Sequence, residues 1–181
     1  MNIRGGSVPG LGGRQATMGR IFQREELVLT CQREKGAGRR VVFTQGCFDL
    51  LHPGHVRCLE EARQLGDFLA VAIYSDEDVR RLKGDDHPAI PQQERAEVLA
   101  ALESVDAVVI LDELALGELL ARLLPNILVK DAALPPDQVV GRKEVEAAGG
   151  RVVSLAVVEA YSTSRMLRTI REARGSAPSY H

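Results

Sequence analysis

The sequence predicts an α/β protein built on a doubly wound parallel sheet of five strands, with helices on both faces. Short apolar runs alternate along the chain with longer segments of helical periodicity, as in repeated β-α-β units. These runs are apolar throughout, which is typical of strands buried on both faces of a parallel sheet. The predicted strands span residues 41–44, 68–74, 107–111, 127–130 and 152–155.

Helices are predicted before, between and after these strands. Residues 20–35 have an amphipathic pattern, and Gly36 or Gly38 is expected to end this first helix. Ligands of such sheets bind beyond the carboxyl ends of the strands, so the loops that follow the strands are where a site is expected. The other helices are predicted at 54–65, 76–82, 92–103, 113–123, 138–148 and 163–173.

The length of 181 residues favours a single domain that buries its own core. Residues 1–19 are rich in Gly and basic side chains and lack periodicity, so they are expected to form a flexible tail. Residues 20–38 are predicted to form an N-terminal helix and linker. The catalytic domain is expected at 39–173, and 174–181 form a short C-terminal tail.

Composition excludes several classes of function. The net charge is −2, so no basic field recruits nucleic acid or an anionic membrane. The sequence shows neither an apolar run that would span a bilayer nor a secretory signal at its start. The three Cys include no C-x-x-C pair, which argues against a disulfide framework or a structural zinc site. A cytoplasmic protein is therefore expected.

A cluster of unusual residues follows the first predicted strand, in the stretch GCFDLLHPGH. Gly46 allows the backbone to turn and to approach a ligand closely. Pro53 suits the first turn of the helix that follows, whose N-terminal N–H groups favour an anion. His52 and His55 share one face of that turn and could donate hydrogen bonds to phosphate oxygens.

Two other interpretations of this His pair stay open at this point. One His could cap the helix while the other is packed in the core. A metal pair is the second alternative, but no Cys or acidic partner lies at ligand spacing, so no protein-bound metal is predicted. The joint occurrence of Gly46, Asp49, His52, Gly54 and His55 at the end of one strand favours the phosphate site.

These residues resemble the G-x-F-D-x-L-H-x-G-H signature of the cytidylyltransferase-like nucleotidyltransferases, whose fold is Rossmann-like and of the HUP type. The resemblance implies that His52 and His55 bind the nucleotide phosphates and stabilise the transition state. It also implies nucleotide contacts along the same stretch, at Thr44, Gly46, Cys47, Phe48, Asp49 and Gly54.

The resemblance extends over residues 25–172, including the stretches IPQQERAEVLAALESVDAVVI and VVGRKEVEAAGGRVV. They are similar to one branch, the nucleotidyltransferase domain of bifunctional ADP-heptose synthase. This branch is D-glycero-β-D-manno-heptose 1-phosphate adenylyltransferase, and the chain is expected to be a stand-alone form without the sugar-kinase domain. Its expected partners are ATP and a sugar 1-phosphate, with Mg²⁺ bound mainly through the ATP phosphates.

Other site residues are predicted from the same resemblance. Lys83, in a polar loop, is expected to contact substrate phosphates, although a solvated surface Lys is the plain alternative. Arg95 is expected to face the nucleotide. The stretch YSTS opens the last predicted helix; a hydroxyl there could simply cap the helix, but the resemblance implies that it binds the distal phosphates. Its residues are Tyr161, Ser162, Thr163 and Ser164.

One loop departs from the branch. After the fourth strand the branch usually carries K-G-G-D-Y, whereas this chain has KDAAL. Lys130 is retained and is expected to bind the acceptor substrate. Asp131 is predicted to replace the lost carboxylate. Because this loop borders the sugar-phosphate pocket in the branch, the change bears on the identity of the acceptor.

The expected reaction is in-line attack of a sugar phosphate oxygen on the α-phosphorus of ATP, which releases pyrophosphate without a covalent enzyme intermediate. Two alternatives stay open: a cytidylyltransferase for glycerol 3-phosphate or a similar alcohol phosphate, and a catalytically weak nucleotide-binding partner protein. A homodimer is the common form among relatives of this fold, and a separate sugar kinase would supply the acceptor.

Overall fold

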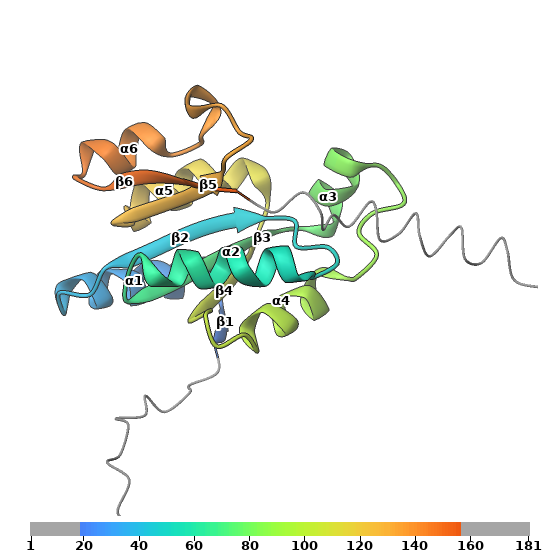
Figure 1. The fold of residues 1–181 in the computed structure, drawn as a ribbon, viewed down its shortest axis with the longest axis horizontal. Helices are drawn as coiled ribbons and strands as arrows, with labels where there is room; N and C mark the ends of the chain where they lie inside the picture. The colour runs from blue at the N-terminus through green and yellow to red at the C-terminus, as the bar shows by residue number, and fades with distance from the viewer. Residues whose placement is uncertain (1–18, 157–181) are drawn as a thin grey trace, which may run out of the picture.

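In a computed structural model, which describes residues 19–156, six strands form one fully parallel sheet (Figure 1). Their order across the sheet is β1-β4-β3-β2-β5-β6. The fold class predicted from the sequence is therefore confirmed. The strands are β1 (Arg20–Phe22), β2 (Val41–Gly46), β3 (Phe68–Tyr74), β4 (Ala107–Leu111), β5 (Ile127–Asp131) and β6 (Arg151–Leu155).

Helices connect the strands and cover both faces of the sheet (Figure 1). One apolar cluster joins α1, α5 and α6 to the sheet, and a second joins α2 and α4 to the opposite face. The helices are α1 (Arg24–Gly36), α2 (Pro53–Gln64), α3 (Asp76–Lys83), α4 (Gln92–Ala100), α5 (Leu116–Leu123) and α6 (Arg142–Ala147), with 3-10 turns η1 (Glu113–Ala115) and η2 (Pro136–Gln138).

The period of the strands explains the two clusters. Along β2, Val41 and Phe43 belong to the cluster under α1, whereas Val42 belongs to the cluster under α2. Successive side chains of a strand point to opposite faces, so an inner strand needs apolar residues at every position. The apolar runs seen in the sequence are thus the consequence of helices on both sides.

The strand order reverses beside β2. From β2 the chain moves to β3 and then β4 on one side, and it returns to place β5 and β6 on the other side. Parallel sheets bind ligands in the crevice at such a switch point, beyond the carboxyl ends of the strands. In Figure 1 the loops after β2 and β3 and the helix α3 lie at this end of the sheet.

Two sequence-based expectations were wrong in detail. The sheet has six strands and not five, because Arg20–Phe22 forms β1 and pairs with β4. The first helix therefore begins at Arg24 and not at residue 20, after Gln23 with extended backbone angles. The local sequence RIFQREEL also suits a helix, and only the open edge of β4 makes it a strand.

The other helix boundaries agree with the prediction to within a few residues. α4 ends at Ala100, and the predicted segment 138–148 contains the shorter helix α6 and only the last residue of η2. The predicted helix at 163–173 and the C-terminal tail lie outside the described residues, as does nearly all of the N-terminal tail. Within residues 19–156, none of the helices is long and apolar enough to cross a membrane.

Candidate active site

The turn after β2 is shaped by two backbone features. Phe48 has a φ of 45°, a left-handed conformation that non-glycine residues rarely adopt. A Cβ atom at Gly46 would lie 3.1 Å from the Phe48 ring, so glycine leaves room for this aromatic side chain. The Phe48 ring in turn lies 5.2 Å from the ring of His55, measured between centroids. The turn thereby supports one of the two His residues.

His52 and His55 lie together at the N-terminus of α2. Their rings are stacked, with centroids 3.7 Å apart and planes 20° from parallel. His52 is the N-cap residue, and its Nδ1 accepts a hydrogen bond of 3.3 Å from the backbone N–H of His55. The capping alternative from the sequence thus holds for His52. Because Nδ1 is the acceptor, the proton of the neutral ring sits on Nε2, which is a donor.

Both imidazoles favour the neutral state in the free protein. Burial lowers the pKa of His55 to about 4, with further lowering by the charges of His52 and Lys83. Burial also lowers the pKa of His52, and Lys83 adds to this effect. An incoming phosphate would reverse the balance, because a nearby negative charge favours the protonated ring. The pair is therefore suited to take up charge when an anion binds.

Lys83 lies on the same side of the molecule as the two His residues. It is the last residue of α3 and is exposed to solvent. Burial is the largest influence on the pKa of His52, of His55 and of the Cys47 thiol: it lowers the pKa of the two imidazoles and raises that of the thiol. The positive charge of Lys83 lowers the pKa of all three groups. The charge of Lys83 therefore reaches the His pair, and the catalytic role of these three residues stays a prediction.

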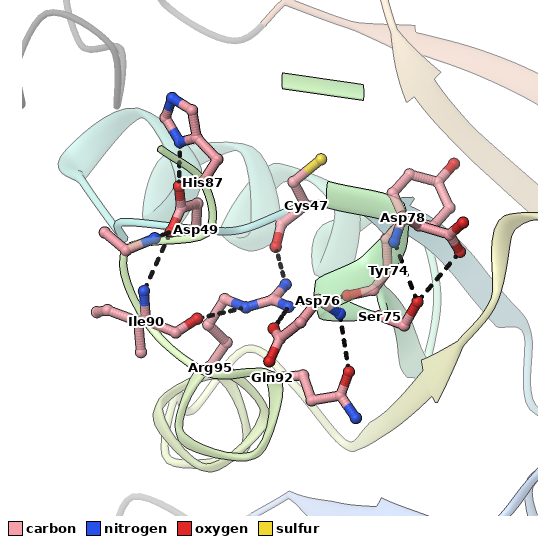
Figure 2. A network of polar contacts seen from close by, with 11 residues as sticks. Cys47, Asp49, Tyr74, Ser75, Asp76, Asp78, His87, Ile90, Gln92 and Arg95 are labelled. Atoms are coloured by element: carbon pink, nitrogen blue, oxygen red, sulfur yellow. Dashed lines mark hydrogen bonds and ion pairs between the residues drawn. The ribbon is translucent and has the colours of Figure 1, made fainter. Parts of the chain in front are cut away.

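Asp49 anchors the loop that joins α3 to α4. Its carboxylate is 1% exposed and lies 2.6 Å from Nδ1 of His87. The same carboxylate accepts hydrogen bonds from the backbone N–H of Ala89 at 2.7 Å and of Ile90 at 3.4 Å (Figure 2). The sequence predicted a nucleotide contact for Asp49; the structure gives it protein partners that fix the loop after Lys83.

Arg95 connects four segments around the site. It is 2% exposed and donates hydrogen bonds to the carbonyls of Ile90 and Tyr74, both at 3.0 Å, and to the carbonyl of Cys47. It also forms an ion pair of 2.7 Å with Asp76, the first residue of α3 (Figure 2). The guanidinium therefore holds the ends of β2 and β3 together from below.

Sequence reasoning missed His87 and Asp76, which complete this polar network. Neither lies in a motif, and each matters only because the fold brings it to Asp49 or to Arg95. A polar loop between two helices gave no signal that one of its residues is paired with a buried carboxylate. The two partners become apparent only once the structure shows that Asp49 and Arg95 are buried, since buried charges require partners.

Both residues predicted to bind the substrate, Lys130 and Asp131, form hydrogen bonds within the loop after β5. Lys130 is 6% exposed, and its ammonium group donates to the carbonyls of Leu134 and, at 3.4 Å, Asp131. The Asp131 carboxylate accepts the backbone N–H of Ala133 at 3.0 Å. The backbone N–H of Ala132 donates to the carbonyl of Leu155 at 2.9 Å. The KDAAL sequence thus folds into a closed turn that is tied to β6.

The remaining predicted nucleotide contacts have simpler positions. Thr44 is buried within β2, between its partners Val71 and Val129. Gly54 is a buried residue in the first turn of α2. The predicted contacts at Tyr161, Ser162, Thr163 and Ser164 lie outside the described residues.

The site is not built as a metal centre of protein ligands within the described range. No three His, Cys, Asp or Glu side chains between residues 19 and 156 come together so that they could hold a metal ion. Two carboxylates in the first turn of α3 have protein partners: Asp76 pairs with Arg95, and Asp78 pairs with Arg81.

The doubly wound sheet and the His pair at the N-terminus of α2 define a class, the nucleotide-binding α/β enzymes that transfer nucleotidyl groups. The sequence model of the cytidylyltransferase-like family matches residues 43–168, and the chain belongs to this family. It is a nucleotidyltransferase. The match contains the complete GCFDLLHPGH stretch.

Curated relatives identify the branch within the family. The chain is 48% identical to the bifunctional protein HldE of Pelobacter propionicus over 153 residues, and this matched region is 84% of the chain. It is 49% identical over 142 residues, or 78% of its length, to HldE of Geobacter sulfurreducens. The matched regions are 31% and 29% of those two relatives, so the chain spans about a third of their length. The resemblance to the HldE branch is thereby confirmed.

Solved structures confirm the fold. A lipopolysaccharide core biosynthesis protein from Thermoplasma volcanium matches with a TM-score of 0.58 and 23% identity, over 67% of this chain and 100% of its own. Pantothenate synthetase from Thermus thermophilus matches with a TM-score of 0.57 and 20% identity, over 88% of this chain and 71% of its own. At these identities the likeness is one of fold.

Proposed function

We propose that the protein is an adenylyltransferase that joins ATP and D-glycero-β-D-manno-heptose 1-phosphate, or a related sugar 1-phosphate, into an ADP-sugar and pyrophosphate. The observation that carries the proposal is the stacked pair of His52 and His55 at the N-terminus of α2, beside Lys83. The similarity to HldE supports the choice of adenylyl transfer and of a heptose phosphate.

The proposed step is an in-line substitution at the α-phosphorus of ATP. A phosphate oxygen of the sugar phosphate forms the new P–O bond, and the bond to the bridging oxygen of pyrophosphate breaks, so the electron pair leaves with pyrophosphate. His52 and His55 donate hydrogen bonds to oxygens on which charge develops. Lys83 neutralises substrate phosphate. Catalysis then comes from position and charge, without a protein nucleophile.

Several residues act in this proposal without touching the reacting atoms. Asp49 and Arg95 hold the turn after β2 and the loop after Lys83, and we propose that they thereby position the His pair and Lys83 relative to the substrates. Mg²⁺, held by phosphate oxygens and water, would screen the charge of the triphosphate. We also propose that Ser162 and Thr163, outside the described residues, hold the distal phosphates.

The wider setting of the reaction is also a proposal. We propose that a separate sugar kinase supplies the sugar 1-phosphate before this enzyme acts. We further propose that the protein is a homodimer, which the resemblance to relatives of this fold supports. We also propose that it acts in the cytoplasm, which the small net charge and the spacing of the three Cys support.

Pyrophosphate release by the purified protein tests this function. The assay contains Mg²⁺ and each of the four common nucleoside triphosphates, with and without the heptose 1-phosphate. We expect release with ATP only when the heptose phosphate is present. The variant His52→Ala should lose most of this turnover, about 100-fold or more, whereas the exposed Lys143→Ala on α6 should keep it.

Other outcomes would replace the proposal. Release with CTP and glycerol 3-phosphate would make the protein a cytidylyltransferase. Binding of ATP without pyrophosphate release from any acceptor would indicate a catalytically weak binding protein. Unchanged turnover in His52→Ala would show that the His pair is not the catalytic centre.

A further inference from the structure

Three polar side chains form a row across neighbouring strands at the switch point of the sheet. They are Gln45 on β2, Lys130 on β5 and Ser154 on β6, and we refer to them as the polar row. Lys130 is the register partner of Ser154. The register of β2 with β5 pairs Thr44 with Val129, and one further step places Gln45 opposite Lys130.

The polar row lies where the apolar core ends. Two residues earlier on the same three strands, Phe43, Leu128 and Val152 pack in the cluster beneath α1, α5 and α6. Side chains two apart on a strand share a face, so the polar row points to this same side of the sheet. Adjacent strands are about 4.8 Å apart, which is close enough for one small ligand to contact all three residues.

The ammonium group of Lys130 favours an anion in this place. It is buried, and its partners are two neutral carbonyl groups. No carboxylate in the described part of the chain forms an ion pair with it. An ammonium has three N–H donors, and a buried charge without a counter-ion is unfavourable. A phosphate oxygen would accept a hydrogen bond from this ammonium group and place a negative charge beside it.

Gln45 adds a second unfilled interaction beside this ammonium. Its Oε1 is buried and has no hydrogen-bond partner among residues 19–156. Its register partner on the other side is Ala72 of β3, a small residue that is fully buried. A buried amide oxygen without a donor destabilises the protein, because it has lost its hydrogen bonds to water. A hydroxyl group of a ligand is the natural donor, and the exposed Ser154 hydroxyl lies at the outer end of the same row.

We propose that the polar row is the subsite for the acceptor, and that Gln45 helps to select it. Lys130 binds the phosphate of the sugar phosphate, while Gln45 and Ser154 bind its hydroxyl groups. This inference rests on the proposed function. It adds to the site three residues on the face of the sheet opposite α2. The closed turn after β5 keeps Lys130 in place for this role.

Three variants of the polar row test the subsite: Gln45→Glu, Lys130→Met and Ser154→Ala. Gln45→Glu places a carboxylate beside Lys130, which competes with the phosphate for the ammonium. We expect this variant and Lys130→Met to raise the KM for the heptose 1-phosphate by about 10-fold to 100-fold, the loss expected for a hydrogen bond to a charged group. The exposed Ser154→Ala should raise it by about 3-fold to 10-fold. ATP affinity should change by less than about twofold, as in the control Lys143→Ala.

Direct binding of the heptose 1-phosphate, measured by calorimetry with a non-hydrolysable ATP analogue present, separates this inference from the proposed function. Binding that is weakened in the variants supports the subsite even if no pyrophosphate is released. If Ser154→Ala and Gln45→Glu both bind the heptose 1-phosphate as tightly as the wild type does, the subsite is overturned. The proposed function would then be unaffected. A loss of ATP affinity instead assigns the row to the nucleotide and also overturns the subsite. No binding by the wild type refutes both this acceptor and the subsite.

Discussion

At the scale of single residues, the site depends on polar groups that the fold has removed from water. Burial makes His55 a poor base in the free protein, with a pKa of about 4. The nearly buried Asp49 and Arg95 have protein partners for their charges, as buried charges must. Each of these side chains therefore has one fixed position, which is what a site that works by placement and charge requires.

The pKa of His55 predicts how stability depends on pH. The folded protein keeps His55 neutral down to about pH 4, whereas the unfolded chain binds the proton near 6.5. Between these values the unfolded state holds more protons, so stability decreases as the pH falls from 6.5 to 4 and changes no further from this group below 4. The slope is at most about 1.4 kcal/mol per pH unit, and solvent screening reduces it.

Urea unfolding at pH 7 and pH 5 checks this prediction. The wild type should lose more free energy of unfolding between these two pH values than the variant His55→Gln, which cannot take up the proton. His52 has a pKa lowered in the same direction and is present in both proteins, so it cancels in the comparison. An equal loss in the two proteins would show that His55 is not held neutral by burial.

At the scale of helices and strands, glycine positions decide how elements fit together. Gly141 precedes α6 with a φ of 77°, and a Cβ atom there would lie 2.4 Å from Cδ1 of the buried Leu120 on α5. Gly117 lies within α5, where the nearest atom to a Cβ would be Val140 Cγ1 at 3.8 Å. The two glycines belong to the same pair of helices but meet different surroundings.

Alanine at these two positions should therefore act in opposite directions. We expect Gly141→Ala to lower the free energy of unfolding by about 2 kcal/mol or more, from the left-handed backbone and the contact with Leu120. We expect Gly117→Ala to raise it by about 0.5–1 kcal/mol, because alanine favours the helix. Thermal and urea unfolding of both variants measure this. A similar loss in both would mean that α5 and α6 do not meet as described.

At the scale of the whole molecule, the site is assembled from segments that are far apart in the sequence. The His pair follows β2, Lys83 ends α3 after β3, and Lys130 belongs to β5. The parallel sheet brings these segments to the carboxyl end of its strands. Asp49 and Arg95 join the loops at this end (Figure 2). Binding of a nucleotide at this end should stabilise the whole fold.

The variant Lys83→Ala tests this coupling between binding and stability. Mg²⁺-ATP at 100 times its Kd should raise the free energy of unfolding of the wild type by about 2.7 kcal/mol. Lys83 is exposed, so its removal should change the ligand-free protein by less than about 0.5 kcal/mol. The gain from the same ATP concentration should fall by about 1.4 kcal/mol, which is a tenfold weaker affinity. Lys143→Ala should behave as the wild type, and an undiminished gain in Lys83→Ala would exclude a phosphate contact.

The parallel α/β sheet could be predicted from the amino-acid sequence, because strands that need apolar residues on both faces are recognisable from their local pattern. The sequence also predicted the His pair and its helix, since His52, Pro53 and His55 are close along the chain and form one capped turn. The tertiary structure alone decided the edge strand β1, whose three residues become a strand only against β4. It alone decided the partners of Asp49 and Arg95 and the row that joins Gln45 to Lys130. These contacts join distant segments, and local propensity and short motifs carry no information about which distant segments meet.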